Sequence, residues 1–137
     1  MPTVQGILET ALYVKDLQVA AAFYRRLFQF LTLLDSERLI ALDVAGRSVL
    51  LLFQEGTTTA SFQTPGGVIP PHAGKPPTHF AFAIAVNDVP TWTEELQTQG
   101  IGLESRVDWQ GGAISLYFRD PDLNLVELIT PGFWRTF

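Results

Sequence analysis

The same order of secondary structure occurs twice in this sequence, and that repeat limits the fold more than any other feature. The first half opens with a strand-like apolar segment, Ile7 to Val14. A helical segment follows from Leu17 to Phe28, where apolar residues recur every three or four positions. Asp16 stands where its carboxylate can accept the free amide hydrogens of the first helical turn. Three further strand-like segments complete the order β-α-β-β-β: residues 30–34, 39–44 and 47–54.

The second half repeats this order with different residues. It begins with an apolar strand, Thr78 to Val86, and we expect Asp88 to cap a helix that ends before Gly100. Strands are then predicted at residues 101–107, 113–118 and 124–129. One pattern that recurs with little sequence identity indicates two modules of the same architecture.

The segment between the halves, residues 56–77, has a different composition. It is rich in Thr, Pro and Gly, and regular structure is not expected there, because proline lacks an amide donor and glycine costs entropy. We predict a single α+β domain over residues 1–137, with module 1 at about 5–55, this linker, and module 2 at about 78–131. Two sheets of four strands, each too short to close alone, would form a curved eight-stranded sheet around a pocket.

The composition excludes several classes of protein. The chain has no cysteine, so disulfides, thiolate nucleophiles and cysteine zinc sites are absent. Nine scattered basic residues and a net charge of −5 argue against a nucleic acid partner, since phosphate binding needs clustered Lys and Arg. No stretch approaches the roughly 20 apolar residues that a membrane-spanning helix needs. The N-terminus shows no secretory signal, so we expect a cytoplasmic protein.

Three ionisable residues stand at related points of the repeat. Glu9 and His79 lie near the start of the strand that opens each half, and Glu127 lies within the last strand of the second half. A carboxylate in an apolar strand is costly to bury unless it is paired or bound to a cation. If the halves are related by approximate symmetry, these side chains would converge and suit Fe(II), Mn(II) or Zn(II). Each also has an ordinary structural explanation: surface exposure for Glu9, a hydrogen-bonded histidine for His79, and an ion pair with Arg119 or Arg47 for Glu127.

Other residues are candidates for contact with a substrate. His72, in the linker, is a candidate acid or base near neutral pH, and a solvated loop histidine is the alternative. Tyr117 shares a strand face with Ser115, so both are candidates for hydrogen bonds to a substrate, while Tyr117 has core packing as its alternative. Arg119 is a candidate either for an anionic ligand or for a structural role in its turn. Two aromatic residues expected beside Glu9 and Leu51 would make the pocket partly apolar: Tyr13 and Phe53.

Two segments carry a resemblance to a known family: LYVKDLQVAAAFYRRLF near the start and SLYFRDPDLNLVELITPGFW near the end. The second is more specific, because an aromatic residue, Arg-Asp-Pro, Asn and Val-Glu-Leu occur in it at that family's spacing. The segment HFAFAI, after the linker, looks like the opening strand of the family's second module. On these residues the chain resembles, over nearly its whole length, the vicinal oxygen chelate superfamily. That superfamily includes glyoxalase I, extradiol dioxygenases, fosfomycin resistance proteins and bleomycin resistance proteins.

The resemblance implies a metal site and also shows where this chain departs from the family. The family's metal positions fall on Glu9, His79 and Glu127, while its fourth-strand position falls on Leu51, which cannot bind metal. Glu9 stands where His or Gln is more usual. Both departures argue against glyoxalase I itself and leave an arrangement closer to the three-ligand site of the dioxygenases. Leu123 replaces a usual Gly, from which we expect that its turn needs no left-handed backbone conformation.

The resemblance leaves two functions open. The first is a metal-dependent dioxygenase, lyase, isomerase or transferase that binds a small oxygenated organic substrate by bidentate chelation to Fe, Mn, Zn or Ni. Its candidate catalytic residues are Glu127, His72 and Tyr117. The alternative is a metal-free protein that sequesters a small molecule such as a drug, for which the acidic chain favours a cationic ligand. The family also implies a homodimer, and the apolar C-terminal segment, residues 131–137, is consistent with an interface.

Overall fold

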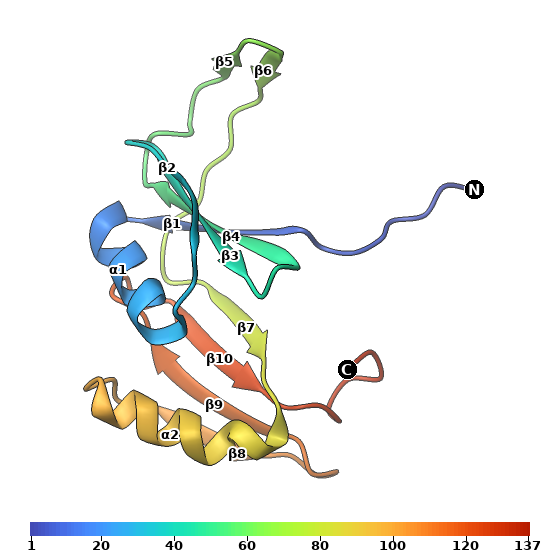
Figure 1. Ribbon diagram of the computed structural model, residues 1–137. Coiled ribbons are helices and arrows are strands. Elements are labelled where there is room, and N and C mark those ends of the chain that lie inside the picture. Colours follow the sequence, from blue (N-terminus) through green and yellow to red (C-terminus); the bar gives the residue numbers. More distant parts are fainter. The chain divides into compact units, whose positions relative to one another are not determined.

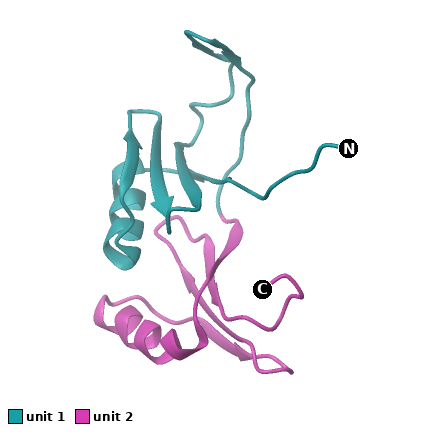
Figure 2. Cartoon of the chain, turned by 45° about the vertical axis from the view of Figure 1, so that its right-hand side comes forward, with its two compact units in different colours: residues 1–76 teal, residues 77–137 magenta.

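Each half of the chain folds around a four-stranded sheet of its own. The structure is a computed structural model that describes residues 1–137, and it divides into two units, Met1–Pro76 and Pro77–Phe137 (Figure 2). The boundary lies at the end of the predicted linker, and the two-module α+β fold class is confirmed. That the two modules make up one domain stays a prediction.

In the first unit, the strand that opens the module lies next to the strand that closes it. The elements are β1 (Glu9–Val14), α1 (Leu17–Phe28), β2 (Thr32–Asp35), β3 (Leu39–Val44) and β4 (Ser48–Gln54). β1 pairs in parallel with β4, and the other pairs are antiparallel, which gives the order β1-β4-β3-β2 (Figure 1). Because parallel neighbours cannot be joined by a tight turn, α1 and the β2–β3 hairpin form the long connection between β1 and β4.

Helix α1 covers one face of this sheet with an apolar stripe. Its buried residues recur at helical spacing: Leu17, Ala20, Ala21, Phe23, Tyr24 and Leu27. They face buried side chains of β3 and β4: Ile40, Leu42, Leu50 and Leu52. As predicted, Asp16 caps the helix, because its Oδ1 accepts the backbone N–H groups of Gln18 at 2.9 Å and Val19 at 3.1 Å.

The opposite face of the same sheet carries the predicted first metal ligand. Side chains alternate along a strand, so Glu9, Ala11 and Tyr13 of β1 point to this face together. Their neighbours on β4 and β3 form the rest of it: Val49, Leu51, Phe53, Leu39 and Ala41. The face therefore runs from a carboxylate at one end to aromatic rings at the other, with aliphatic side chains between them.

The second unit repeats the arrangement of the first. Its elements are β7 (His79–Ala83), a 3₁₀ turn η1 (Val86–Asp88), α2 (Val89–Thr98), β8 (Ser105–Asp108), β9 (Ile114–Arg119) and β10 (Leu125–Ile129). β7 is parallel to β10, and the sheet order is β7-β10-β9-β8 (Figure 1). The core contains Leu96 of α2 together with buried strand residues: Leu116, Phe118, Val126 and Leu128.

The linker contains regular structure, which the sequence analysis did not predict. β5 (Phe62–Thr64) and β6 (Gly67–Ile69) form an antiparallel hairpin within the first unit. Pro65 and Gly66 occupy the turn, and the Thr64 hydroxyl donates to the Gly67 carbonyl at 2.6 Å across it. The prolines therefore lie in the turn or outside the strands, where they remove no hydrogen bond from the ladder.

Two local predictions in the second unit were wrong. Asp88 makes no side-chain hydrogen bond to α2, because η1 places its backbone at φ −90° and ψ −4°, outside the extended region from which a capping side chain reaches. Leu123 has a φ of 67°, so its turn does adopt the left-handed conformation. The cause is Asp120, whose Oδ1 accepts the backbone N–H groups of Asp122 and Asn124, both at 2.9 Å, and so fixes the backbone on both sides of Leu123.

No helix in the structure is long and apolar enough to cross a membrane.

Candidate active site

Glu127 lies at the centre of β10 and is the most buried acidic side chain among the predicted site residues. Only 7% of its surface is exposed, and no Lys or Arg pairs with it. Instead, its Oε2 accepts hydrogen bonds from the hydroxyl groups of Ser115 at 2.5 Å and Tyr117 at 3.2 Å. Both donors lie on β9, where the register places Tyr117 directly opposite Glu127. The shared face that alternation predicts for Ser115 and Tyr117 is therefore the face of Glu127.

A hydrogen bond from Trp109 extends this arrangement. The indole Nε1–H donates to the Ser115 hydroxyl at 2.8 Å. Since an indole can only donate, the Ser115 oxygen accepts from Trp109 and its own proton points to Glu127. Ser115 is fully buried, so the hydrogen bonds run in one direction, from Trp109 through Ser115 to Glu127. These hydrogen bonds fix one oxygen of the Glu127 carboxylate and leave the other free for a different partner.

Burial raises the pKa of the Tyr117 hydroxyl above its ordinary value, and the neighbouring Glu127 carboxylate raises it further. A hydrogen bond with Ser115 acts in the opposite direction. The net effect keeps the phenol protonated at neutral pH, as its role as a donor to Glu127 requires.

His79 faces the second oxygen of Glu127. The two side chains come from the adjacent strands β7 and β10, and His79 Nε2 lies 3.3 Å from Glu127 Oε1. The other ring nitrogen, Nδ1, lies 2.9 Å from the backbone carbonyl oxygen of Leu125. A carbonyl only accepts, so Nδ1 carries a hydrogen, and in the neutral ring the lone pair is on Nε2. Nε2 and Oε1 are then two electron donors side by side, whereas a protonated ring would make an ion pair with Glu127.

This donor pair fits a divalent cation. Imidazole and carboxylate ligands suit first-row divalent metals, and a ligand histidine usually donates its other N–H to a carbonyl, as His79 does to Leu125. The side chain of His79 is half exposed, so the pair is open to solvent on one side. No cluster of three or more metal-ligating side chains occurs in the structure. Glu9 belongs to the first unit, where it is exposed at the start of β1, and its place as a third ligand stays a prediction.

Arg119 has structural partners. Its Nε donates to Glu104 Oε2 at 2.8 Å, and its Nη1 donates to the Leu123 carbonyl oxygen at 3.0 Å. These contacts join the ends of β8 and β9 to the turn before β10. Arg119 therefore pairs with Glu104 and not with Glu127, and a role in substrate binding stays a prediction.

The first unit has a cavity of its own on the sheet face that α1 does not cover. Its volume is about 460 Å³, within the usual range for small-molecule sites. It is lined by Glu9, Leu33, Leu34, Arg38, Leu39, Ala41, Val49, Leu51, Phe53, Ile69 and His72. Three of the predicted site residues therefore line one cavity: Glu9, Phe53 and His72.

Tyr13 and the linker hold His72 at the edge of this cavity. The Tyr13 hydroxyl and His72 Nδ1 are 2.5 Å apart, and the ring of His72 lies edge-on to Phe53 at 4.8 Å between centroids. The backbone of His72 is tied to Thr58, whose amide carbonyl accepts from the His72 N–H at 2.9 Å and whose hydroxyl donates to the His72 carbonyl at 2.6 Å. Gly74 packs directly on the Tyr13 ring. His72 is thus held by contacts with Tyr13, Phe53 and Thr58, and its role as an acid or base stays a prediction.

Arg38 also lines this cavity, which was not predicted from the sequence. It directly precedes β3, whose first residue Leu39 is paired with Phe53, and its guanidinium carbon lies 5.8 Å from the centre of the Phe53 ring. The signal in the sequence was only a charged residue beside an expected strand. Its place in the cavity depends on the strand register, which no local pattern specifies.

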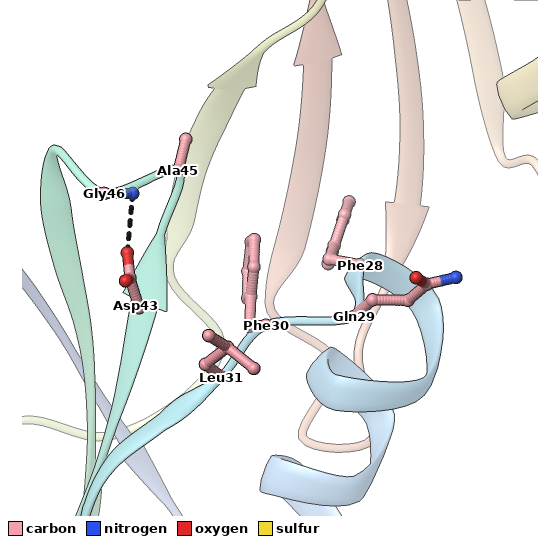
Figure 3. A pocket seen from close by; sticks show the side chains of 7 residues that line it. All are labelled: Phe28, Gln29, Phe30, Leu31, Asp43, Ala45 and Gly46. Atoms are coloured by element: carbon pink, nitrogen blue, oxygen red, sulfur yellow. Dashed lines mark hydrogen bonds between the residues drawn. The ribbon is translucent and has the colours of Figure 1, made fainter.

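A second hollow in the first unit lies apart from all predicted site residues. Its volume is about 360 Å³, and it lies where the end of α1 approaches the β3–β4 turn (Figure 3). Phe28 and Phe30 stack there at 5.0 Å, and the only acid, Asp43, accepts the Gly46 N–H at 2.6 Å within the turn. The hollow therefore offers an apolar wall without a free catalytic group.

The chain is similar to a known family of proteins, both in sequence and in structure. A family model described as Glyoxalase/Bleomycin resistance protein/Dioxygenase superfamily matches residues 6–128. The chain is 30% identical over 126 residues to the metallothiol transferase FosB of Bacillus licheniformis, across 91% of this chain and 75% of the relative. It resembles the crystal structure of lactoylglutathione lyase from Agrobacterium tumefaciens with a TM-score of 0.88 and 32% identity, covering 98% and 99% of the two chains.

A more distant likeness concerns the fold alone. The fosfomycin resistance protein FosX of Listeria monocytogenes, complexed with Mn(II) and sulfate, is similar with a TM-score of 0.70 and 24% identity, over 96% of this chain and 94% of that one. The match of the family model over most of the sequence decides the assignment. The chain belongs to the glyoxalase/bleomycin resistance protein/dioxygenase superfamily.

Proposed function

We propose that this chain is a metal-dependent enzyme that acts on a small oxygenated organic substrate, binding it through two neighbouring oxygens on a divalent metal. The observation that carries the proposal is the donor pair of His79 Nε2 and Glu127 Oε1, 3.3 Å apart, with the imidazole hydrogen held on Nδ1 by the Leu125 carbonyl. A buried carboxylate without a Lys or Arg partner is costly, and a bound cation would offset that cost.

The relatives support this proposal. The Bacillus licheniformis relative is named a metallothiol transferase, and the Listeria monocytogenes FosX structure contains Mn(II). We propose Glu9 as the third ligand and Fe, Mn, Zn or Ni as the ion. Such an ion supplies Lewis-acid polarisation of the substrate oxygens and stabilises negative charge that develops on them.

The residues around Glu127 would orient it and hold protons. Ser115 and Tyr117 both donate to Oε2, so they fix the carboxylate with Oε1 directed at the site. Tyr117 keeps its proton at neutral pH and can share it with a substrate oxygen in place of Glu127. His72, anchored by Tyr13, is a candidate acid or base at the cavity of the first unit.

One observation favours a second function, the metal-free sequestration of a small molecule. Leu51 stands where a family member with four ligands has a carboxylate, and it lines a cavity whose walls are mostly apolar. A protein with this cavity can bind a ligand without any chemical step. The metal measurement below separates the two functions.

We also propose a cytoplasmic homodimer. Three aromatic side chains near the C-terminus are exposed and would suit an interface between copies: Phe133 at 40%, Trp134 at 64% and Phe137 at 45%. Sedimentation equilibrium at micromolar concentration tests this, and a mass of one chain alone would contradict it.

The decisive experiment is a titration of chelator-treated protein with Mn(II) and Zn(II), followed by calorimetry and elemental analysis. We expect about one ion per chain, with binding lost in His79→Ala and Glu127→Gln. His72→Ala is the matched control, because it removes the other histidine, which lies outside the donor pair, and it should bind metal normally. Equal metal binding by His79→Ala and the unaltered protein would exclude the donor pair, and no binding under any condition would leave the sequestering function.

A further inference from the structure

The cavity of the first unit has opposite charges at its two ends and an apolar middle. Glu9 and Tyr13 are four residues apart on β1, which corresponds to about 13 Å along a strand. Phe53 pairs with Tyr13 at the far end, and Arg38 and His72 lie beside Phe53. The aliphatic wall lies between the two ends: Leu33, Leu34, Leu39, Ala41, Val49 and Leu51.

Arg38 brings a cation into this cavity without a carboxylate to balance it. Its side chain is half-buried, and no acid lies within ion-pair distance. The guanidinium carbon lies over the Phe62 ring at 4.3 Å and over the Phe53 ring at 5.8 Å, while Nε donates weakly to the Thr57 carbonyl oxygen at 3.5 Å. Contact through the flat face of a guanidinium leaves the N–H groups at its edge available, and they match the two oxygens of a planar carboxylate.

The middle of the cavity requires an apolar ligand. Leu33 and Leu34 of β2 line the cavity and are 57% and 48% exposed. Burying such side chains against a hydrocarbon body is favourable, whereas a short polar ligand would leave them in water.

We propose that this cavity binds an elongated apolar carboxylate, with its carboxylate at Arg38 and its hydrocarbon body along β4 toward Glu9. The ligand is an aryl-alkanoic or medium-chain carboxylic acid whose body spans about 10 Å of the roughly 13 Å between the ends. His72 adds a second polar group beside the carboxylate. Its Nδ1 already contacts the Tyr13 hydroxyl, so Nε2 is the ring nitrogen that remains for the ligand. Local charge thus reverses the expectation from net charge, which favoured a cationic ligand.

The inference rests on the proposed function only where it names this ligand as the substrate. In that case, the substrate would also carry the two neighbouring oxygens that the proposed function requires for the metal. Binding of the acid to the cavity needs no metal, and it can be measured with the metal removed.

The test is calorimetric titration of chelator-treated protein with three probes of equal length: 4-phenylbutyrate, 4-phenylbutanol and 4-phenylbutylamine. We expect the acid to bind at least about 10-fold more tightly than the alcohol, and the amine to bind most weakly. Arg38→Gln should remove the preference for the acid and leave the alcohol unchanged. Arg47→Gln, at the β3–β4 turn outside the cavity, is the matched control and should keep the preference. Equal binding of acid and alcohol, a preference for the amine, or no effect of Arg38→Gln would each overturn the inference.

Two further variants separate this inference from the proposed function. Leu51→Gln should weaken the binding of both the acid and the alcohol, because it places an amide in the apolar wall. Its unchanged far-ultraviolet circular dichroism would exclude unfolding as the cause. His79→Ala should keep the preference for the acid while losing Mn(II), so failure of metal binding and failure of carboxylate binding are distinct results. Loss of the acid preference in His79→Ala would contradict a site confined to the first unit.

Discussion

Ser115 holds the candidate site together, and its removal should be costly. Ser115→Ala deletes a hydroxyl that is fully buried, that donates to Glu127 at 2.5 Å and that accepts from Trp109 at 2.8 Å. A hydrogen bond to a charged partner contributes about 1.5–3 kcal/mol, and a buried donor left without its acceptor costs about 1–3 kcal/mol. Water can reach the half-buried indole, which reduces the second cost. We therefore expect the free energy of unfolding to fall by about 3 kcal/mol.

The matched comparison is Tyr117→Phe, which removes the other hydroxyl from the same carboxylate oxygen. That hydrogen bond is longer, 3.2 Å, and the side chain is half-buried, so water can take the place of the phenol. We expect a loss of about 0.5–1 kcal/mol. Urea unfolding of both variants measures the difference, and thermal melting should show a drop of about 10 °C for Ser115→Ala.

The reasoning that Ser115 links Trp109 to Glu127 would be refuted if Ser115→Ala lowered the free energy of unfolding no more than Tyr117→Phe does. The same variant also bears on the proposed metal. Groups that orient a ligand typically affect metal affinity by about 10-fold or more, so Ser115→Ala should bind Mn(II) more weakly than Tyr117→Phe. Equal affinities would indicate that Glu127 is fixed by its strand alone.

Three backbone predictions test the turns and the linker by chemical denaturation. Ala45 and Gly46 have φ values of 57° and 64° at the centre of the β3–β4 turn. Asparagine before glycine is the residue best suited to such a turn, so Ala45→Asn should stabilise the protein by about 0.5–1 kcal/mol. Destabilisation by this substitution would contradict the turn type. Leu123→Gly should stabilise the protein by a similar amount, about 0.5–1 kcal/mol, because glycine adopts a φ of 67° without strain. A lower free energy of unfolding would mean that the leucine side chain makes a stabilising contact. Gly74→Ala places a methyl group in the Tyr13 ring, so it should destabilise by about 1–3 kcal/mol and shift the aromatic circular dichroism, whereas an unchanged spectrum would show that the linker moves away freely.

Local patterns predicted the elements whose causes are themselves local. The period of apolar residues and the carboxylate of Asp16 define α1, and strand alternation places Ser115 and Tyr117 on the face of Glu127. The same rule places Tyr13 on the face of Glu9 and Phe53 on the face of Leu51, and the β1–β4 register brings the two aromatic residues together. These predictions hold because each depends on neighbours within a few residues or on a single strand register.

The failures share another cause. Asp88 does not cap α2 because a 3₁₀ turn precedes it, and Leu123 is left-handed because Asp120 binds the amides on both sides. Arg38 enters the cavity through the register of β3 with β4. Glu9 as a third metal ligand stays a prediction, since alternation determines only its face within its own sheet. Such features depend on what surrounds a residue in space, and composition and periodicity do not report it.

The parallel pairing of β1 with β4, and of β7 with β10, has a consequence for how the protein forms during synthesis. Glu9 is paired with Val49 and His79 with Leu125, so each opening strand must wait for about forty further residues before its ladder can form. β7 has β10 as its only neighbour in the sheet. A ribosome that stops before β10 therefore releases a chain whose β7 edge is unpaired and free to join other chains. β7 and β10, the strands that carry His79 and Glu127, are thus the last to be paired, and termination before β10 is complete would favour aggregation over a partly active product.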